Sequence, residues 1–385
     1  MKNVNTTATF LDAKPHYDLL DGLRGVAALL VVCYHIFEGF SFAELTNAAG
    51  DGLIRTLNHG YLAVDFFFML SGFVISYAYD DRWHSMSTLG FFRRRLIRLH
   101  PMLLVGVLIG VMTFVVQGRV TWSGDTIGWE WIALSALLAC FMLPALPGWG
   151  YEVRGNGEAF PLNGPSWSLF FEYIGNILYA FLLRRLNKTW LAVVVVATGL
   201  GWAWFALTNV SGYGSIGVGW TIDSVNFGGG MLRMLFPFSL GMLLARHFKP
   251  FYIRGAFAWC SLALLALFSV PYIEGQSPVC LNSLYELFCL VVAFPLIVWV
   301  GASGTAGSGK SSYVCNMLGQ LSYPLYIIHY PFMYLFYAWL IDNQLYTLGD
   351  TWPVALCVVV GCMVLAYALL RLYDLPVRRY LARLR

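Results

Sequence analysis

The feature that most constrains this chain is a series of eleven apolar stretches, each about 18 to 23 residues long. They lie at 22–40, 62–79, 96–117, 129–146, 166–184, 190–208, 229–247, 254–272, 282–301, 319–341 and 353–374. A transmembrane helix needs about 20 apolar residues, whereas a transmembrane strand needs only about ten that alternate in polarity. The stretches therefore predict an all-α bundle of membrane-spanning helices and exclude a β-barrel.

The composition supports the same fold class. Hydrophobic residues make up 59% of the chain and charged residues 11%, against about 25% charged in soluble domains. This content excludes a soluble or disordered protein, and a net charge of +4 is too small to indicate nucleic-acid binding. No polar connection is long enough for a soluble domain. We therefore expect one integral membrane domain over 1–385.

Several familiar sequence signals are missing. Six of the eight cysteines lie inside apolar stretches, which predicts small core side chains and no disulfide framework. No C-x-x-C or H-E-x-x-H spacing occurs, so we expect no metal site. The polar residues Lys2, Asp12, Lys14 and Asp18 precede the first apolar stretch without a cleavage pattern. We therefore expect no removable signal peptide.

Positive charges predict the orientation, because cytoplasmic connections of membrane proteins are rich in Lys and Arg. The connections that carry them, and the tail, contain Arg82, Arg93, Arg94, Arg95, Arg98, Arg184, Arg185, Lys188, Arg246, Lys249, Arg254, Lys310, Arg371, Arg378, Arg379, Arg383 and Arg385. The connections poor in Lys and Arg lie at 41–61, 118–128, 209–228, 273–281 and 342–352. We assign the first set to the cytoplasm and the second to the outside.

One stretch breaks the alternation of sides. Two full spans between 118–128 and 184–190 would place both connections on one side. We predict that 129–146 is an interfacial or re-entrant helix, because it begins with tryptophans and ends in a Pro- and Gly-rich segment. We therefore predict a multi-pass protein of the cytoplasmic (inner) membrane with about ten spans. Both of its termini are expected in the cytoplasm.

The first apolar stretch contains the strongest cluster of ionisable residues. Arg24 and His35 are eleven residues apart, so they share one helix face about 16 Å apart, and Asp21 lies on the same face. Charges within a membrane span are costly and often mark functional sites. The alternative interpretation is that Arg24 anchors the cytoplasmic end and His35 is a core histidine.

Other polar residues occur inside or at the ends of apolar stretches. They are Asp65, Ser71, Trp167, Glu172, Tyr323, His329 and the arginines at 93–98. The arginines suit either of two roles: they can anchor the cytoplasmic end of a span, or their planar guanidinium groups can bind phosphates.

Residues 304–311 match the P-loop pattern, Gly-x-x-x-x-Gly-Lys-Ser. A nucleotide-binding P-loop requires a preceding strand, a following helix and a carboxylate on a second strand. Here apolar stretches of spanning length flank the match. We interpret it as a Gly- and Ser-rich cytoplasmic connection.

Five motifs occur in a fixed order. They are Leu-Asp-Gly-Leu-Arg-Gly-Val-Ala-Ala at 20–28 followed by His35, Phe-Phe-Phe-Met-Leu-Ser-Gly-Phe at 66–73, Arg-Arg-x-x-Arg-x-x-Pro at 94–101, Trp-Ser-Leu-x-x-Glu at 167–172, and Leu-Ser-Tyr-x-Leu-Tyr-x-x-His-x-Pro at 321–331. In this order the set resembles the membrane-bound acyltransferase-3 family, most strongly over 19–331. The chain is similar to members that stand alone, without an added extracytoplasmic domain.

The resemblance implies transfer of an acyl group, most often acetyl, from cytoplasmic acyl-coenzyme A to a hydroxyl of an extracytoplasmic or lipid-linked glycan. It implies that His35 is the essential histidine, that Arg24 is its paired arginine, and that Arg94, Arg95 and Arg98 bind the donor. Glu172 is a further candidate catalytic residue, which could orient His35 or bind an acceptor hydroxyl. Asp21, Asp65, Ser71, Trp167, Tyr323 and His329 are candidates for substrate binding or structural support.

A neutral histidine is the usual general base at pH 7, and acyl-CoA supplies phosphates for the arginines to bind. A covalent acyl-histidine intermediate is the competing mechanism. A glycan or lipid-linked sugar transporter would use the same polar residues as a permeation path. A purely structural membrane protein is disfavoured, because it has little use for intramembrane His and Glu.

Overall fold

The computed structural model describes residues 17–251, 253–273, 280–304 and 310–384. Within these ranges the protein is all-helical, and its only β-type pairings are two isolated bridges between loop residues. Nine of the described helical segments are long and apolar enough to cross a membrane. The predicted class, a multi-pass helical membrane protein, is therefore confirmed.

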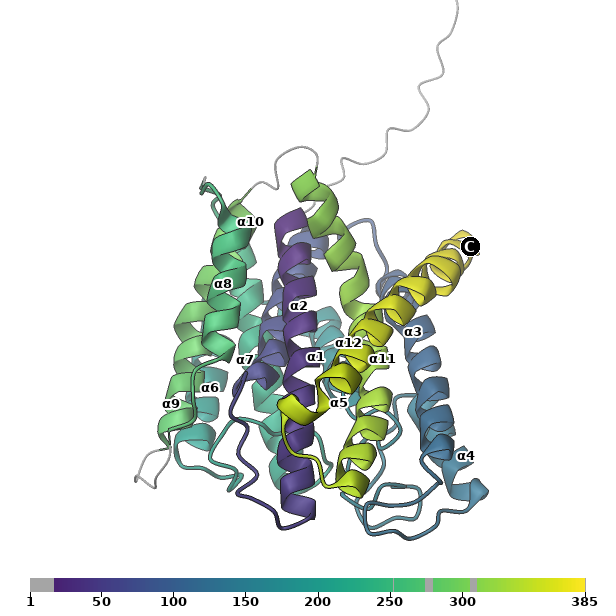
Figure 1. Ribbon diagram of the computed structural model, residues 1–385. Helices are drawn as coiled ribbons and strands as arrows, with labels where there is room; N and C mark the ends of the chain where they lie inside the picture. Colours follow the sequence, from purple (N-terminus) through teal and green to yellow (C-terminus); the bar gives the residue numbers. More distant parts are fainter. Residues whose placement is uncertain (1–16, 252, 274–279, 305–309, 385) are drawn as a thin grey trace, which may run out of the picture.

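The helices follow one another along the chain, and most have spanning length (Figure 1). The α-helices are α1 (Asp18–Thr46), α2 (Ala63–Tyr79), α3 (Thr88–Val116), α4 (Trp129–Cys140), α5 (Ser166–Phe181), α6 (Lys188–Leu207), α7 (Ser224–His247), α8 (Ala256–Phe268), α9 (Leu281–Phe288), α10 (Phe294–Ser303), α11 (Lys310–Asn343), α12 (Leu348–Leu369) and α13 (Leu375–Arg383). Short π-helices join α9 to α10 (η4, Cys289–Ala293) and α12 to α13 (η5, Leu370–Asp374). Three short 3₁₀-helices are η1 (Gly60–Leu62), η2 (Asp80–Arg82) and η3 (Leu183–Arg185).

Helix α8 is shorter than its apolar stretch predicts, although it still runs between the two ends of the bundle: Ala256 packs with Leu19 at the start of α1, and the His59 N–H donates to the Phe268 carbonyl at 3.0 Å. The apolar stretch 254–272 forms a helix of 13 residues, about 20 Å long, whereas a bilayer core is about 30 Å thick. Gly255 adopts a left-handed φ of 72° and so starts the helix late. Pro271 follows its end and disfavours helical geometry at Val270. Nine long helices and two short ones, α4 and α8, together account for the eleven apolar stretches.

Helix α4 enters and leaves at the same end of the bundle. It has 12 residues, and the segments on either side of it are joined by a hydrogen bond from the Trp122 N–H to the Arg154 carbonyl at 3.0 Å. Within the segment that follows α4, the Ala145 N–H donates to the Ala159 carbonyl at 2.7 Å. This arrangement is the one expected of a helix that does not cross.

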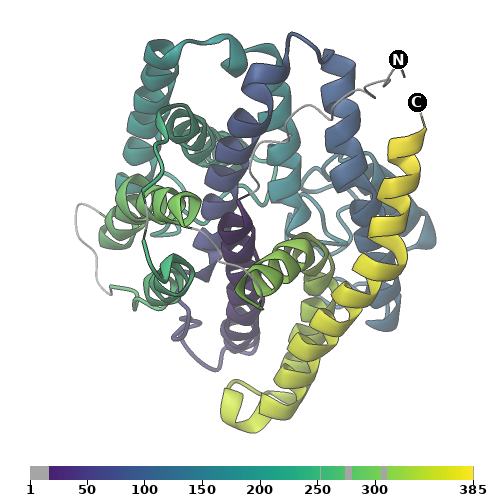
Figure 2. The same cartoon turned by 90° about the horizontal axis from the view of Figure 1, so that it is seen from above.

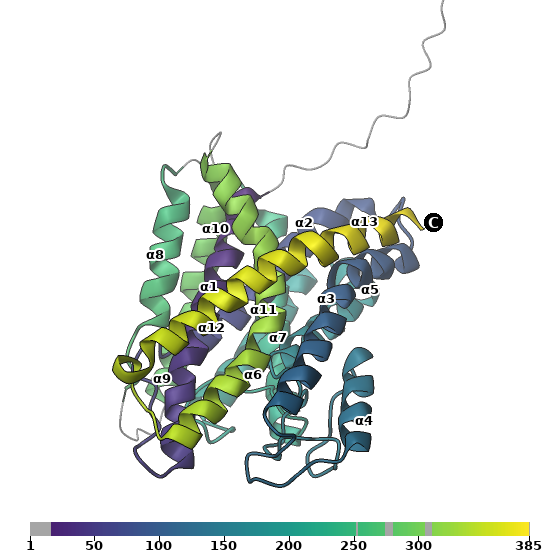
Figure 3. The ribbon, with the colours of Figure 1, turned by 45° about the vertical axis from the view of Figure 1, so that its right-hand side comes forward.

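Helix α1 lies in the middle of the bundle, with the other helices around it (Figure 2). Helix α11 packs along it. The start of α1 and the end of α13 lie at the same end of the molecule (Figures 1 and 3). The start of α3 is also there, because the Arg93 guanidinium donates to the Leu381 carbonyl at 3.2 Å. We call this the arginine end; the loops around 47–59, 117–128 and 208–223 form the opposite, loop-rich end (Figure 3).

Glycines allow the central helices to approach closely, as is common in membrane bundles. A Cβ at Gly72 of α2 would lie 1.9 Å from the Phe238 carbonyl oxygen of α7, and one at Gly241 of α7 would lie 2.1 Å from the Met69 oxygen. On the other side of α1, a Cβ at Gly25 would lie 2.5 Å from the Leu318 oxygen of α11. These contacts set the spacing of the helices that surround the two cavities described next.

Candidate active site

Two cavities lie one above the other between the central helices. The inner cavity, toward the arginine end, has a volume of about 100 Å³. The outer cavity, toward the loop-rich end, has a volume of about 440 Å³. Val64 of α2 and Tyr326 of α11 line both of them, so the two cavities adjoin at these side chains.

The inner cavity is lined by three of the predicted arginines. Arg24 of α1 and Arg95 and Arg98 of α3 face it, together with Glu172 and Ser71. The Arg95 guanidinium donates to the Glu172 carboxylate at 2.6 Å, and the Ser71 hydroxyl donates to the same oxygen at 3.0 Å. Glu172 balances Arg95, and Asp21 balances Arg24 at 2.6 Å, so Arg98 supplies the remaining positive charge that the cavity offers to an anionic group.

Hydrogen bonds fix two of the residues that line the inner cavity, one within α1 and one between α11 and α3. Arg24 donates to Asp21, its predicted neighbour, at 2.6 Å. The Tyr323 hydroxyl donates to the Leu99 carbonyl at 2.6 Å, which ties α11 to α3. Asp21 and Tyr323 therefore support the cavity from behind its arginines.

The structure separates Arg94 from Arg95 and Arg98. Residues three apart on a helix share a face, whereas neighbours point about 100° apart. Arg95 and Arg98 accordingly line the inner cavity, while Arg94 is exposed and contacts the Met86 sulfur at 3.5 Å. The expected role of Arg94 in donor binding therefore has no support from its position.

The outer cavity contains a histidine–carboxylate pair. His35 Nδ1 lies 2.6 Å from Glu38 Oε2, and the His35 side chain is only 12% exposed. Glu38 also accepts hydrogen bonds from Tyr337 at 2.9 Å, Tyr330 at 3.3 Å and Tyr34 at 3.3 Å. Three tyrosines and one histidine thus hold this carboxylate in place.

The geometry assigns the proton on His35. A carboxylate accepts hydrogen bonds, so Nδ1 carries the hydrogen that Glu38 receives; in the neutral form of the ring, Nε2 is then the nitrogen with the lone pair. No described residue forms a hydrogen bond to Nε2. Glu38 therefore fixes the His35 ring through Nδ1 on the wall of the outer cavity.

His329 packs beside His35, and no hydrogen bond joins these two side chains. The two rings stack with centroids 5.3 Å apart and planes 29° apart. His329 is fully buried, and its Nδ1 lies 2.8 Å from the Tyr326 carbonyl. It supports the position of the His35 ring from α11.

Glu38, and not Glu172, is the carboxylate that contacts His35. Glu172 was expected to orient His35 or bind an acceptor; it contacts Arg95 and Ser71 in the inner cavity instead. Glu38 is the residue bound to His35, and it was missed. Its signal was available, since His35 and Glu38 are three residues apart on a helix.

Asp65 takes part in a buried ion pair that the sequence did not reveal. Arg233 of α7 donates to Asp65 at 2.8 and 3.0 Å, and both side chains are almost fully buried. Arg233 also donates to the Val218 carbonyl at 2.8 Å and stands 5.1 Å from the Trp167 ring centroid. Arg233 and Trp167 line the outer cavity, so Asp65 fixes this part of its wall.

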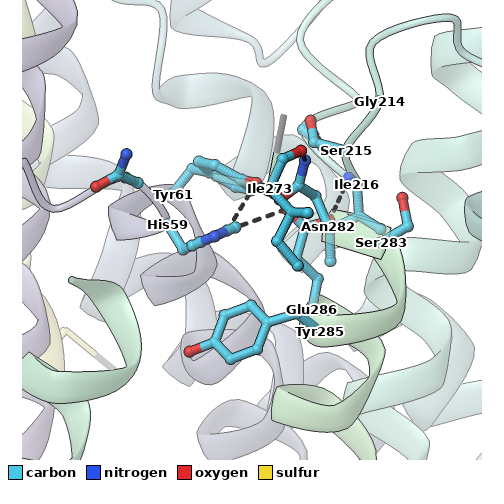
Figure 4. Close-up of polar contacts among 12 residues, drawn as sticks. His59, Tyr61, Gly214, Ser215, Ile216, Ile273, Asn282, Ser283, Tyr285 and Glu286 are labelled. Atoms are coloured by element: carbon cyan, nitrogen blue, oxygen red, sulfur yellow. Dashed lines mark hydrogen bonds and ion pairs between the residues drawn. The ribbon is translucent and has the colours of Figure 1, made fainter. Parts of the chain in front are cut away.

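A second buried cluster holds the wall of the outer cavity against the loops (Figure 4). Tyr61 lines the cavity, and its hydroxyl donates a hydrogen bond to the Glu286 carboxylate. His59 Nδ1 lies 3.2 Å from the same carboxylate. The other Glu286 oxygen accepts from the Ile216 N–H at 2.8 Å. Glu286 therefore joins η1, α9 and the loop before α7.

Glu158 lies at the mouth of the outer cavity, in the loop between α4 and α5. It accepts hydrogen bonds from Tyr334 and, at 2.8 Å, from Asn156. Burial raises the pKa of Glu158 to about 7, although these hydrogen bonds and the Arg154 guanidinium favour its ionised form. The Arg154 guanidinium stacks on the Tyr334 ring, 3.5 Å from its centroid.

Metal ligands are not gathered anywhere in the described part of the chain: no group of three or more His, Cys, Asp or Glu residues there could hold a metal ion. The polar side chains that line the two cavities include histidine, carboxylate, tyrosine and arginine groups, with serines beside them. Residues 305–309, five of the eight in the P-loop match, lie outside the described residues.

A histidine with one nitrogen fixed and the other free, set in a membrane bundle beside an arginine-lined cavity, suits proton removal next to a site for an anionic co-substrate. These features define the protein as a membrane-embedded group-transfer enzyme. The family model described as an acyltransferase domain, acyltransferase-3, matches residues 17–371. The chain therefore belongs to the acyltransferase-3 family, and it is an acyltransferase.

Two of the relatives named below carry acyltransferase names, which agrees with this membership. The chain is 27% identical to acyltransferase MdmB of Streptomyces mycarofaciens over 321 residues, which cover 81% of this chain and 77% of the relative. It is 35% identical to protein 2 in the picA locus of Rhizobium radiobacter, over 42% of this chain and 80% of that protein. It is 26% identical to peptidoglycan O-acetyltransferase OatA of Listeria monocytogenes, over 94% of this chain and 55% of OatA. No solved structure matches the chain.

Proposed function

We propose that this acyltransferase moves an acyl group, acetyl in the first instance, from cytoplasmic acyl-CoA to a hydroxyl of an extracytoplasmic or lipid-linked glycan. The observation that carries the proposal is the adjacency of the two cavities. One holds arginines suited to phosphates, the other holds an oriented base, and Val64 and Tyr326 line both. A donor in the inner cavity can therefore meet an acceptor in the outer one.

The reaction begins with the acceptor hydroxyl in the outer cavity. His35 Nε2 takes the hydroxyl proton as the oxygen attacks the thioester carbonyl, because a sugar hydroxyl is too weakly acidic to react alone. The new C–O bond forms, the C–S bond breaks, and coenzyme A leaves as a thiolate that takes a proton from water on the inner side. The His35 imidazolium releases its proton to water in the outer cavity and returns to the neutral form. Glu38 holds the correct His35 tautomer and stabilises the imidazolium, which is the role of the carboxylate in related triads.

The donor is placed by charge. Arg24, Arg95 and Arg98 present guanidinium groups to the inner cavity, and guanidinium forks match phosphate oxygens. Acyl-CoA carries a pyrophosphate and a 3′-phosphate at the end opposite its thioester. With these phosphates at the arginine end, the pantetheine arm points toward Tyr326 and His35.

The acceptor is proposed from the lining of the outer cavity and from the relatives. Aromatic side chains dominate its walls, and their faces suit the apolar faces of sugar rings. One relative is named for O-acetylation of peptidoglycan. A glycan hydroxyl presented at the outer face of the cytoplasmic membrane fits both observations.

The test compares the acylation of cell-surface polysaccharide by mass spectrometry. A strain without the gene is restored with the wild-type gene or with His35→Ala, Glu38→Gln or Glu38→Ala. We expect His35→Ala to abolish acylation and the Glu38 variants to lower it about a hundredfold, since a positioned general base contributes about 10²–10⁴-fold. Full acylation by a well-expressed His35→Ala protein would contradict the proposal.

The same variants separate direct transfer from an acyl-histidine intermediate. The purified protein is mixed with labelled acetyl-CoA in the absence of acceptor, and its intact mass is measured. Direct transfer predicts no covalent label. A label that disappears in His35→Ala would instead assign the nucleophile to His35.

A further inference from the structure

The boundary between the two cavities is made of few side chains, and they are fixed in place. Val64 and Tyr326 line both cavities and are 6% and 8% exposed. Phe67 packs edge-on against Tyr326 from the inner cavity, with ring centroids 5.6 Å apart. The Tyr326 hydroxyl lies 2.8 Å from the Ser168 hydroxyl, which also holds its ring. We call Val64, Phe67 and Tyr326 the partition.

We propose that the partition selects the length of the transferred acyl group and restricts it to short chains such as acetyl and propionyl. The proposal rests on the proposed function, in which donor and acceptor approach from opposite cavities. In that arrangement the thioester sulfur lies on the inner side of the carbonyl carbon to which it is bonded. The hydroxyl oxygen attacks the same carbon from the outer side. The carbonyl carbon must react at the partition itself.

The acyl tail has little room in that position. The carbonyl carbon is planar, so with sulfur on one side and the attacking oxygen above the plane, the tail lies alongside Val64, Phe67 and Tyr326. Valine is stiff at χ1, and the Tyr326 ring is held at its face by Phe67 and at its hydroxyl by Ser168. Each additional methylene must therefore displace well-packed side chains, which is unfavourable.

Helix α2 offers a matched pair of residues for the test. Val64 and Val74 are both valines on this helix, ten residues or about 15 Å apart. Val64 lines both cavities, whereas Val74 lines the inner cavity only. Val64→Ala and Val74→Ala remove the same atoms, but only the first enlarges the partition.

The experiment measures transfer of labelled acyl groups from acetyl-, propionyl- and butyryl-CoA in permeabilised membranes that carry the native acceptor. We expect wild type to discriminate against butyryl-CoA, and Val64→Ala to raise its rate relative to acetyl-CoA about tenfold or more, the scale on which pockets distinguish one methylene. Val74→Ala is expected to keep the wild-type ratio. Val64→Ile adds a methylene and is expected to lower the propionyl-to-acetyl ratio.

The outcomes separate this inference from the function on which it rests. Loss of transfer from every acyl-CoA in wild-type membranes would overturn the proposed function. Acetyl transfer with the same donor ratios in wild type, Val64→Ala and Val64→Ile would overturn only the role of the partition. If Val64→Ala does not accumulate in the membrane, Val64→Ile decides, because its effect has the opposite sign.

Discussion

At the residue scale, the arginines of α3 differ in position although they are close in sequence. Arg95 and Arg98 line the inner cavity, and Arg94 is exposed outside it. The positive-inside rule treats all three alike, and it also treats Lys and Arg alike. Phosphate binding does not, because an ammonium group lacks the two-pronged fork of a guanidinium.

We therefore predict that Arg98→Lys and Arg95→Lys raise the Michaelis constant for acyl-CoA about tenfold, the scale of one charged hydrogen bond. Arg94→Lys is the matched control and is expected to keep the wild-type constant. The measurement is the acyl-CoA dependence of transfer in membrane vesicles. If all three variants keep the wild-type dependence on acyl-CoA concentration, these arginines do not bind the donor and only set the orientation of the helix in the membrane.

Glu158 predicts a dependence of stability on pH. Its pKa is about 7 in the folded protein, against 4.5 in an exposed chain, because burial disfavours the charged form. Between these values the folded state holds a proton that the unfolded state has lost, so the free energy of unfolding falls as pH rises. The fall is complete above about pH 7 and amounts to about 3 kcal/mol at most.

We expect Glu158→Gln to remove this part of the pH dependence, since an amide does not titrate in this range. The measurement is the midpoint of thermal unfolding in detergent between pH 4.5 and 8. Glu130→Gln on the exposed face of α4 is the control and is expected to keep the wild-type slope. An unchanged slope in Glu158→Gln would assign the pH dependence to other groups.

At the scale of helices, the crossing of α2 and α7 depends on two glycines. A Cβ at Gly72 or Gly241 would meet a backbone oxygen of the other helix at 1.9 or 2.1 Å. Backbone cannot move aside like a side chain, so the two helices would have to separate. Val64 and Phe67 of the partition lie on α2. Asp65 is also on α2, and its ion-pair partner Arg233 lies on α7.

We predict that Gly72→Ala and Gly241→Ala each lower the free energy of unfolding by at least about 1–3 kcal/mol, the usual effect of overpacking. Gly228→Ala on α7 is the control, because nothing lies within 4 Å of the added Cβ. It is expected to be neutral or stabilising by up to about 1 kcal/mol. The measurement is thermal unfolding of the purified proteins; equal stability of all three variants would contradict the close crossing.

The sequence predicted the elements far better than the contacts between them. Apolar stretches of spanning length located the helices, and helical spacing placed Arg24 and His35 on one face. The same spacing contained the His35–Glu38 pair. The Asp65–Arg233 pair joins residues 168 positions apart, and the boundary at Val64 and Tyr326 joins α2 to α11. Such pairings are fixed by tertiary packing, for which a single sequence has no periodic signal.

At the scale of the whole molecule, the arrangement of connections predicts which segments share a side of the membrane. Ser123 and Pro147 lie in exposed connections at the loop-rich end, on either side of α4. His84 lies in the exposed connection between α2 and α3, at the arginine end. If the arginine end faces the cytoplasm, as the positive-inside rule indicates, the first two are external and His84 is internal.

We expect Ser123→Cys and Pro147→Cys to react with a membrane-impermeant thiol reagent in intact cells, and His84→Cys to react only after permeabilisation. The background is a variant in which all eight free cysteines are replaced. Labelling of Ser123→Cys and Pro147→Cys from opposite sides would mean that α4 crosses the membrane.

The adjacency of the two cavities also has an electrical consequence. Water that fills a cavity from either side carries the bulk potential inward, so the membrane voltage falls mainly across the thin protein layer at Val64 and Tyr326. One charge moved across the full voltage changes the free energy by about 2.3 kcal/mol per 100 mV. In the proposed reaction the hydroxyl proton is released to one side of this layer and the thiolate to the other. We therefore predict that an imposed potassium diffusion potential in sealed vesicles changes the rate of acyl transfer. A rate independent of voltage would mean that the proton follows the thiolate through the layer, and the enzyme would then work equally well in an energised and a de-energised membrane.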